Sequence, residues 1–179
     1  MGETKKATDN VVRNEKGLIY KPEENKLVVS GILVNFRHST TKYSKGEEYF
    51  QVSIRTESLT PEVVKMIKER YFFDTIPKYF PSFIKDAEET GCKEPIYINL
   101  KSRYEISTFR EGEGNTKYSY DDVIELGEGL PPNGSEVKLS IRLKVELDDK
   151  GNPTGKGSVY PLGLLITKLQ KQDAGAYFD

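Results

Sequence analysis

The sequence contains few of the residues on which catalytic and metal sites are usually built. It has one cysteine, one histidine and no tryptophan in 179 residues. Cys92 therefore cannot form an internal disulfide, and with His38 it supplies at most two ligands where zinc takes about four. A hydrolytic triad could use only His38, which has no nucleophile motif beside it. We therefore expect no enzyme, no cofactor and no bound metal.

Long apolar runs and a large net charge are also absent. No segment approaches the roughly 20 apolar residues of a transmembrane helix, and no secretory leader opens the chain, so we expect an intracellular protein. Because the net charge is only −1, attraction for a polyanion would have to come from cations gathered on one face. The glycine pairs complete no dinucleotide-binding or P-loop motif, which argues against a phosphate-binding loop.

Two acidic pairs, Asp121-Asp122 and Asp148-Asp149, are the candidates for a magnesium-dependent nuclease. Hard cations favour oxygen ligands. Adjacent residues of a strand point to opposite faces, so neither pair would converge on one ion unless it lay in a turn. We favour solvated turn carboxylates, and a nuclease is the least favoured function.

Alternating apolar and polar residues are the strongest structural signal, and they are clearest between Asn133 and Leu169. A glycine-rich loop, Asp148 to Gly157, divides this stretch into two strands, and the second is more apolar, with Tyr160, Leu162, Leu164 and Ile166. The first strand predicts one buried face and one mostly basic face. Its inward residues are Val137, Leu139, Ile141, Leu143, Val145 and Leu147, and its outward residues are Glu136, Lys138, Ser140, Arg142, Lys144 and Glu146.

The other expected strands are Lys26 to His38, Glu48 to Thr56 and Ile96 to Ile106, with a short edge strand at Leu18 to Tyr20. The first of them is apolar on both sides, which predicts burial of both faces over part of its length. Between the strands, Thr60-Pro61 predicts the start of a helix that runs to Tyr71. Prolines at 77 and 81 interrupt it, and a second helix is expected from Pro81 to Thr90.

The outward sides of two strands combine aromatic rings, amides and cations. A single-stranded nucleic acid needs this combination, because bases stack on aromatic rings and phosphates follow cations; stacking contributes roughly 1 to 3 kcal/mol per base. The alternative, an ordinary solvent-facing strand surface, stays open. The expected binding residues are Tyr49, Gln51, Arg55, Tyr97, Asn99, Lys101 and Arg103, extended by Lys138, Arg142 and Lys144 and by the loop residues Lys42, Lys45, Lys117, Lys150 and Lys156.

The C-terminal segment leaves the strand pattern and ends in aromatic and acidic residues, Asp173, Tyr177, Phe178 and Asp179. Three interpretations are open: a peptide that a partner protein docks, a segment that folds back onto the basic groove, or a disordered end.

Three short motifs support a family resemblance: Asn133-Gly134-Ser135 before the alternating strand, the run from Gly157 to Leu165, and the closing Ala176-Tyr177-Phe178-Asp179. With this layout the chain, from Lys26 to Asp179, resembles the single-stranded-DNA-binding proteins of bacteriophages and related mobile elements, which are OB-fold proteins. The resemblance implies cooperative, sequence-tolerant coverage of single strands in replication or recombination, and a tail that recruits replication proteins. The tail is less acidic than is usual in that family, and the helical insertion precedes the Ile96 strand, unlike the simplest OB layout.

The sequence thus predicts a mainly β protein with a five-stranded antiparallel OB-fold barrel. We expect a flexible arm at 1–16, the OB domain at 17–169 with an aromatic helical insertion at 59–94, and a tail at 170–179. The expected function is non-catalytic single-stranded DNA binding in the cytoplasm of a bacterial host, with a homo-oligomer left open. The leading alternative is a protein-interaction or virion structural β-barrel whose interface is the aromatic cluster Tyr71, Phe72, Phe73, Tyr79, Phe80 and Phe83.

Overall fold

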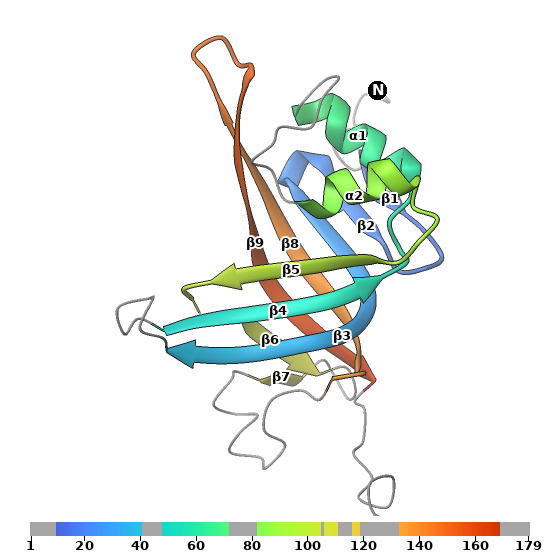
Figure 1. The fold of residues 1–179 in the computed structure, drawn as a ribbon, viewed down its shortest axis with the longest axis vertical. Coiled ribbons are helices and arrows are strands. Elements are labelled where there is room, and N and C mark those ends of the chain that lie inside the picture. The colour runs from blue at the N-terminus through green and yellow to red at the C-terminus, as the bar shows by residue number, and fades with distance from the viewer. Residues whose placement is uncertain are drawn as a thin grey trace, which may run out of the picture.

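A computed structural model describes residues 10–40, 48–71, 82–104, 106–110, 116–118 and 133–168 (Figure 1). The helices in these ranges are η3 (Pro22–Glu24), α1 (Pro61–Tyr71) and α2 (Ser82–Thr90). Neither α-helix of this part of the chain is long and apolar enough to cross a membrane. The strands are β1 (Val12–Arg13), β2 (Ile19–Lys21), β3 (Lys26–Thr40), β4 (Glu48–Thr56), β5 (Ile96–Ser102), β6 (Ser107–Arg110), β7 (Thr116–Tyr118), β8 (Glu136–Leu147) and β9 (Pro153–Lys168).

All the described strands belong to one nine-stranded sheet, in the order β1-β2-β3-β8-β9-β6-β7, with β4 pairing β3 and β5 pairing β4. The β6–β9 pair is parallel and the other pairs are antiparallel. The mainly β class and the two helices are therefore confirmed. The expected barrel of five antiparallel strands is not, because the sheet has more strands and one parallel pair.

The long strand β3 organises the sheet. One of its edges pairs first with β2 and then with β4, while the other edge pairs with β8 from Lys26 to Ile32. A bulge between Leu33 and Asn35 shifts the alternation by one residue. Leu33 and Phe36 are consequently both buried, and Val34 is 39% exposed. Before the bulge, Leu27 and Val29 are buried and Val28 is half-buried, whereas Val34 lies outside the part of β3 that is covered on both faces.

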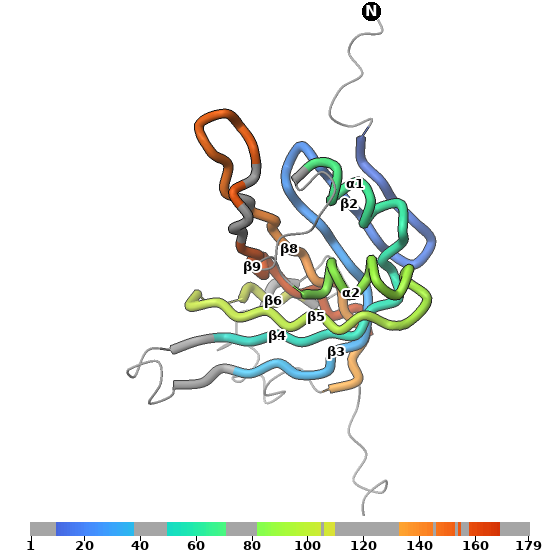
Figure 2. Tube along the Cα trace, turned by 45° about the horizontal axis from the view of Figure 1, so that its top comes forward, coloured from blue at the N-terminus to red at the C-terminus, as the bar shows by residue number. Residues whose placement is uncertain are grey.

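The core joins the inward side chains of the curved sheet to those of the two helices, which sit together near β1 and β2 (Figures 1 and 2). The predicted inward residues of β8 are buried as far as Leu143. Leu147 is 54% exposed instead, because β8 and β9 extend beyond the body as a two-stranded arm (Figure 1). The helices contribute Val63, Val64, Ile67, Phe83, Ile84 and Ala87 to the core.

A buried polar network fixes the junction between β3 and β4. The Thr56 hydroxyl donates to the carbonyl oxygen of Ser30, and the Ser58 hydroxyl accepts from the Ser30 backbone N–H at 3.3 Å. The Asn14 side-chain amide donates to the Ser58 carbonyl at 2.8 Å, and its own oxygen accepts from the Leu18 N–H at 3.0 Å. Since β1 also pairs with β2, the described sheet reaches into the segment 1–16 that the sequence analysis assigns to an arm.

Helix α1 begins with the cap that the sequence predicts. The Thr60 hydroxyl accepts a hydrogen bond from the Val63 N–H at 3.3 Å, and Pro61 is the first helical residue.

We expect Thr60→Ala to lower the free energy of unfolding by about 1 kcal/mol, because the helix loses this cap. Thr60→Ser keeps a hydroxyl and should be nearly as stable as the wild type. Urea unfolding measures both variants. An alanine variant as stable as the wild type would show that the cap does not stabilise the helix.

Candidate nucleic-acid interface

The outward side of β3, β4 and β5 carries three cross-strand rows of side chains. Because strand side chains alternate, these rows face away from the core residues Phe36, Val52, Ile54, Ile98 and Leu100. We name this surface the sheet face. Its rows are Arg37, Gln51 and Lys101; then Asn35, Ser53 and Asn99; then Ile32, Arg55 and Tyr97.

Tyr97 is the most prominent aromatic residue of the sheet face. Its side chain is 63% exposed, and Arg55, also exposed, lies directly opposite on β4. Tyr104, two residues after the end of β5, is 83% exposed. An exposed ring beside a guanidinium offers a stacking surface for a base and a positive charge for its phosphate.

A small amide network occupies the centre of the sheet face. The Asn99 side-chain oxygen accepts hydrogen bonds from the Gln51 amide at 2.8 Å and from the Ser53 hydroxyl at 3.0 Å. These bonds restrain side chains from both strands. They also leave the Asn99 amide nitrogen able to donate outward, as a group that contacts a base edge or a sugar would need to.

Five outward cations of the sheet differ from the helix lysines in their surroundings. On the helices, Lys65 pairs with Glu69 at 3.9 Å, Lys85 with Glu89 at 4.0 Å, and Lys68 with Glu88. Within the described ranges, no ion pair neutralises the outward cations Arg37, Arg55, Lys138, Arg142 and Lys144. These five cations therefore remain available to phosphates, although the net charge of the chain is close to zero.

The basic side of β8 continues the sheet face across β3. Ile32 pairs with Arg55 on one edge of β3 and with Glu136 on the other. From there Lys138 lies opposite Ser30, and Arg142 lies opposite Lys26. The outward residues of β8 that the sequence singles out thus share one surface with those of β4 and β5.

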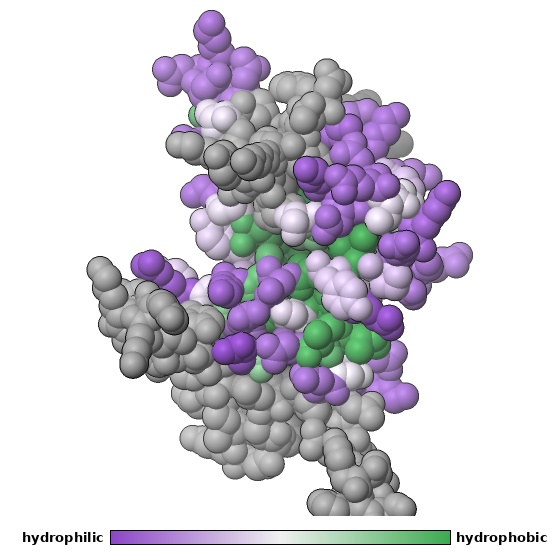
Figure 3. Space-filling view, viewed as in Figure 1, coloured by the Kyte–Doolittle hydropathy of each residue, from purple (hydrophilic) through white to green (hydrophobic). Residues whose placement is uncertain are grey.

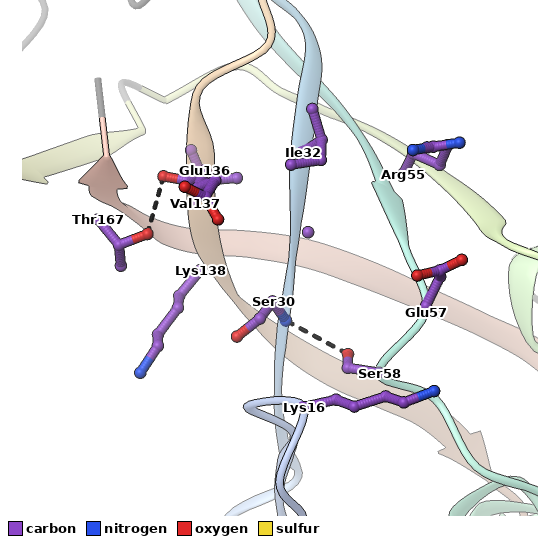
Figure 4. Close-up of a pocket in the computed structure, with 11 residues that line it drawn as sticks. Lys16, Ser30, Ile32, Arg55, Glu57, Ser58, Glu136, Val137, Lys138 and Thr167 are labelled. Carbon is purple, nitrogen blue, oxygen red and sulfur yellow. Dashed lines mark hydrogen bonds between the residues drawn. The ribbon is translucent and has the colours of Figure 1, made fainter. Parts of the chain in front are cut away.

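A hollow of about 330 Å³ lies where these strands meet (Figure 4). Its cationic side chains are Lys16, Arg55 and Lys138, and its acidic ones are Glu57 and Glu136. It adjoins the sheet face through Ile32 and Arg55. The same hollow thus offers both hydrogen-bond donors and acceptors beside Tyr97. Figure 3, in the view of Figure 1, shows apolar residues at the surface over the middle of the sheet and hydrophilic residues at the arm tip.

Several expected binding residues cannot be placed. Lys42, Lys45 and the tail residues Asp173, Tyr177, Phe178 and Asp179 lie outside the described residues, as does most of the aromatic cluster of the alternative interpretation. The backbones of Tyr49, Lys117 and Lys156 lie in β4, β7 and β9, but their side chains are not described. Gln51, Arg55, Tyr97, Asn99 and Lys101 lie together, and Arg103 follows the end of β5. Lys150 is exposed at the tip of the arm, away from β4 and β5 (Figure 1).

The acidic pair at the arm tip has the geometry of a turn. The Asp148 carboxylate accepts hydrogen bonds from the backbone N–H groups of Lys150 at 2.8 Å and Asn152 at 2.9 Å. This agrees with the turn interpretation of Asp148-Asp149. Asp121 and Asp122 lie outside the described residues. In the part of the chain that is described, no three histidine, cysteine, aspartate or glutamate side chains form a group that could hold a metal ion.

Sequence reasoning missed outward residues at two bulges. In β3 the bulge turns Asn35 and Arg37 outward. The sequence did carry a signal for this, because two polar residues flank the apolar Phe36. In β9 the register shifts at Leu162, because Ser140 pairs with Gly163 while Ile141 pairs with Pro161. Leu164 and Ile166 are therefore buried, whereas Tyr160 is 43% exposed. Tyr160 and Leu164 therefore lie on different sides of β9, although both belong to the apolar strand that the sequence predicts.

Comparison with known proteins identifies the fold. No protein-family model and no curated protein sequence matches the chain. The solved structure of the C-terminally truncated single-stranded DNA-binding protein from bacteriophage Enc34 matches with a TM-score of 0.55 at 13% identity, over 91% of this chain and 96% of that chain. The same phage protein in complex with single-stranded DNA matches with a TM-score of 0.54 at 12% identity, over 90% and 96% of the two chains. The resemblance inferred from the sequence is thus confirmed at the level of the fold, which this chain shares with a phage single-stranded DNA-binding protein.

Proposed function

We propose that the protein binds single-stranded DNA on the sheet face, without catalysis and with tolerance of base sequence. The observation that carries the proposal is the row of Arg55 and Tyr97, which are exposed side by side. Arg55 and Arg37 of the same sheet face form no ion pair with a described carboxylate. The shared fold supports it, because the phage Enc34 protein was solved with single-stranded DNA bound.

The tyrosines and the cations of this surface are proposed to contact different parts of the DNA. Tyr97 stacks on a base, and Tyr49 is proposed to do the same further along β4. Arg37, Arg55, Lys101 and Arg103 attract phosphates, and the cations of β8 extend the track. Stacking needs an open base face, which a duplex hides between neighbouring pairs, so this surface favours single strands. Every base has such a face, and hence the binding tolerates sequence.

A five-stranded OB-type barrel is the architecture we propose for this surface. The barrel strands would be β3, β4, β5 continued by β6, β9 and β8. Each pairs with the next, except that β5 leads into β6 along the chain, and β8 pairs with β3 to close the circuit. This assignment places α1 and α2 between the second and third barrel strands. OB folds bind oligonucleotides on the face of those two strands, which here are β4 and β5.

The biological role that fits is protection of single strands during phage-type replication or recombination in the bacterial cytoplasm. The tail from 170 to 179 is proposed to recruit replication proteins. Both proposals rest on the sequence resemblance and on the shared fold.

Fluorescence anisotropy with labelled oligo-dT and a matched duplex tests the binding. We expect the single strand to bind more tightly and its affinity to fall as salt rises. Arg37→Gln should lower the slope of log affinity against log salt by about 0.7, the value for one phosphate contact to a single strand. Lys65→Gln, on the outer side of α1, is the matched control and should leave that slope unchanged. Equal affinity for the two DNAs, or affinity indifferent to salt, would refute the proposal.

A further inference from the structure

A second groove lies outside the sheet face, where η3, the end of α1 and the base of the β8–β9 arm meet. Its volume is about 700 Å³. Figure 1 shows α1 on one side of this region and the arm on the other. The wall residues that matter here are Asn25, Arg70, Arg142, Lys144, Leu147 and Tyr160.

One wall combines an aromatic ring with cations. Tyr160 lies directly opposite Arg142, and Lys144 lies opposite Ser158 on the neighbouring strand. The Ser158 hydroxyl donates to the Tyr160 hydroxyl at 3.0 Å, which restrains the ring. Tyr160 is 43% exposed. Arg142 and Lys144 form no ion pair with any described carboxylate.

The remaining walls are built by other parts of the chain. The Leu143 N–H donates to the Asn25 carbonyl at 2.8 Å, which joins β8 to the turn after η3. Arg70 reaches the groove from the end of α1, where it lies 4.0 Å from Glu23. Leu147, 54% exposed, adds an apolar surface further out on the arm. The groove thus places a ring beside a cation, as the sheet face does, but on β8 and β9 instead of β4 and β5.

We infer that this groove is a second subsite for single-stranded DNA, with Tyr160 stacking on a base and Arg142 and Lys144 contacting phosphates. The inference rests on the proposed function. β8 connects the two sites, because Glu136 adjoins the row of Arg55 and Tyr97 through Ile32. Arg142 is six residues further along this strand, about 20 Å at the usual rise. A single strand that follows Lys138 along β8 would therefore occupy both sites, and OB folds cover about 4 to 16 nucleotides.

Affinity as a function of DNA length tests the inference. An oligo-dT of about five nucleotides can occupy the sheet face alone, whereas one of about twenty can reach both sites. We expect Tyr160→Ala to weaken binding of the long oligonucleotide about tenfold and of the short one by less than about twofold, since one stacking contact is lost. Tyr160→Phe keeps the ring and should bind both as the wild type does. Arg142→Gln with Lys144→Gln should lower the salt slope for the long oligonucleotide by about 1.4, for two phosphates.

The outcomes separate this inference from the proposed function. Tyr97→Ala should weaken binding of both lengths, because the sheet face is used by both. Unchanged affinity of Tyr160→Ala for the long oligonucleotide, or an equal loss for both lengths, would overturn the second subsite and leave the first. A wild-type protein that binds neither length would overturn the proposed function itself. Thermal melting of Tyr160→Ala should match the wild type, which separates a binding loss from unfolding.

Discussion

Replacing Tyr97 and Arg55 together by alanine is expected to weaken binding of single-stranded oligonucleotides about a hundredfold. A stacked aromatic ring contributes roughly 1 to 3 kcal/mol per base, and a phosphate contact adds to it; about 1.4 kcal/mol corresponds to tenfold in affinity. Both side chains are exposed on adjacent strands, so their removal takes little from the core. Anisotropy titration measures the binding, and circular dichroism melting checks that the fold is retained.

A matched control for this variant lies on the second helix. Lys85 is exposed and lies 4.0 Å from Glu89, so Lys85→Ala removes a cation that the proposal does not use. Its dissociation constant should equal that of the wild type at moderate salt. A double variant at Tyr97 and Arg55 that binds as well as this control would exclude the sheet face as the main site.

Gly31→Ala is expected to cause the largest loss of stability of any conservative change considered. A Cβ atom at this position would lie 2.2 Å from the carbonyl oxygen of Arg55 and 3.0 Å from its carbonyl carbon. These are backbone atoms of the paired strand, so β3 and β4 must move apart to make room. We expect the free energy of unfolding to fall by about 2 to 3 kcal/mol, as in overpacked cores. Guanidinium unfolding measures the change.

Gly163→Ala is the control for that experiment. A Cβ there meets the Ser107 carbonyl oxygen at 3.4 Å, an ordinary contact, and neither glycine has a positive φ. The two substitutions therefore restrict the unfolded chain equally. Gly163→Ala should change stability by less than about 1 kcal/mol. Similar losses for the two variants would show that β3 and β4 do not approach each other as closely as described.

Local sequence patterns predicted the regular parts of this fold. The alternation of β8, the Thr60 cap and the inward residues of β4 follow from neighbouring residues, and each has its expected place. The approach of Tyr97 to Arg55 was only half predictable. Alternation placed both outward, but which strands pair and in what register depends on contacts between distant parts of the chain.

The errors have a common physical cause. A β-bulge adds one residue to a strand and reverses the facing of every residue beyond it. The bulge at Val34 turned Asn35 and Arg37 outward, and the one at Leu162 exposed Tyr160. No composition rule marks these positions, so the sequence alone does not place Tyr160 on the outer surface. The parallel β6–β9 pair was also missed. β6 has only four residues, Ser107 to Arg110, and so short a strand shows no clear alternation in the sequence.

Photocrosslinking of a single strand that carries 5-iodouracil tests the central claim most directly, because the reaction joins bases to the aromatic side chains that they contact. The account predicts crosslinks at Tyr97, with their loss in Tyr97→Ala. Crosslinks confined to the helices α1 and α2, with Tyr97 unmodified at saturating DNA, would contradict it.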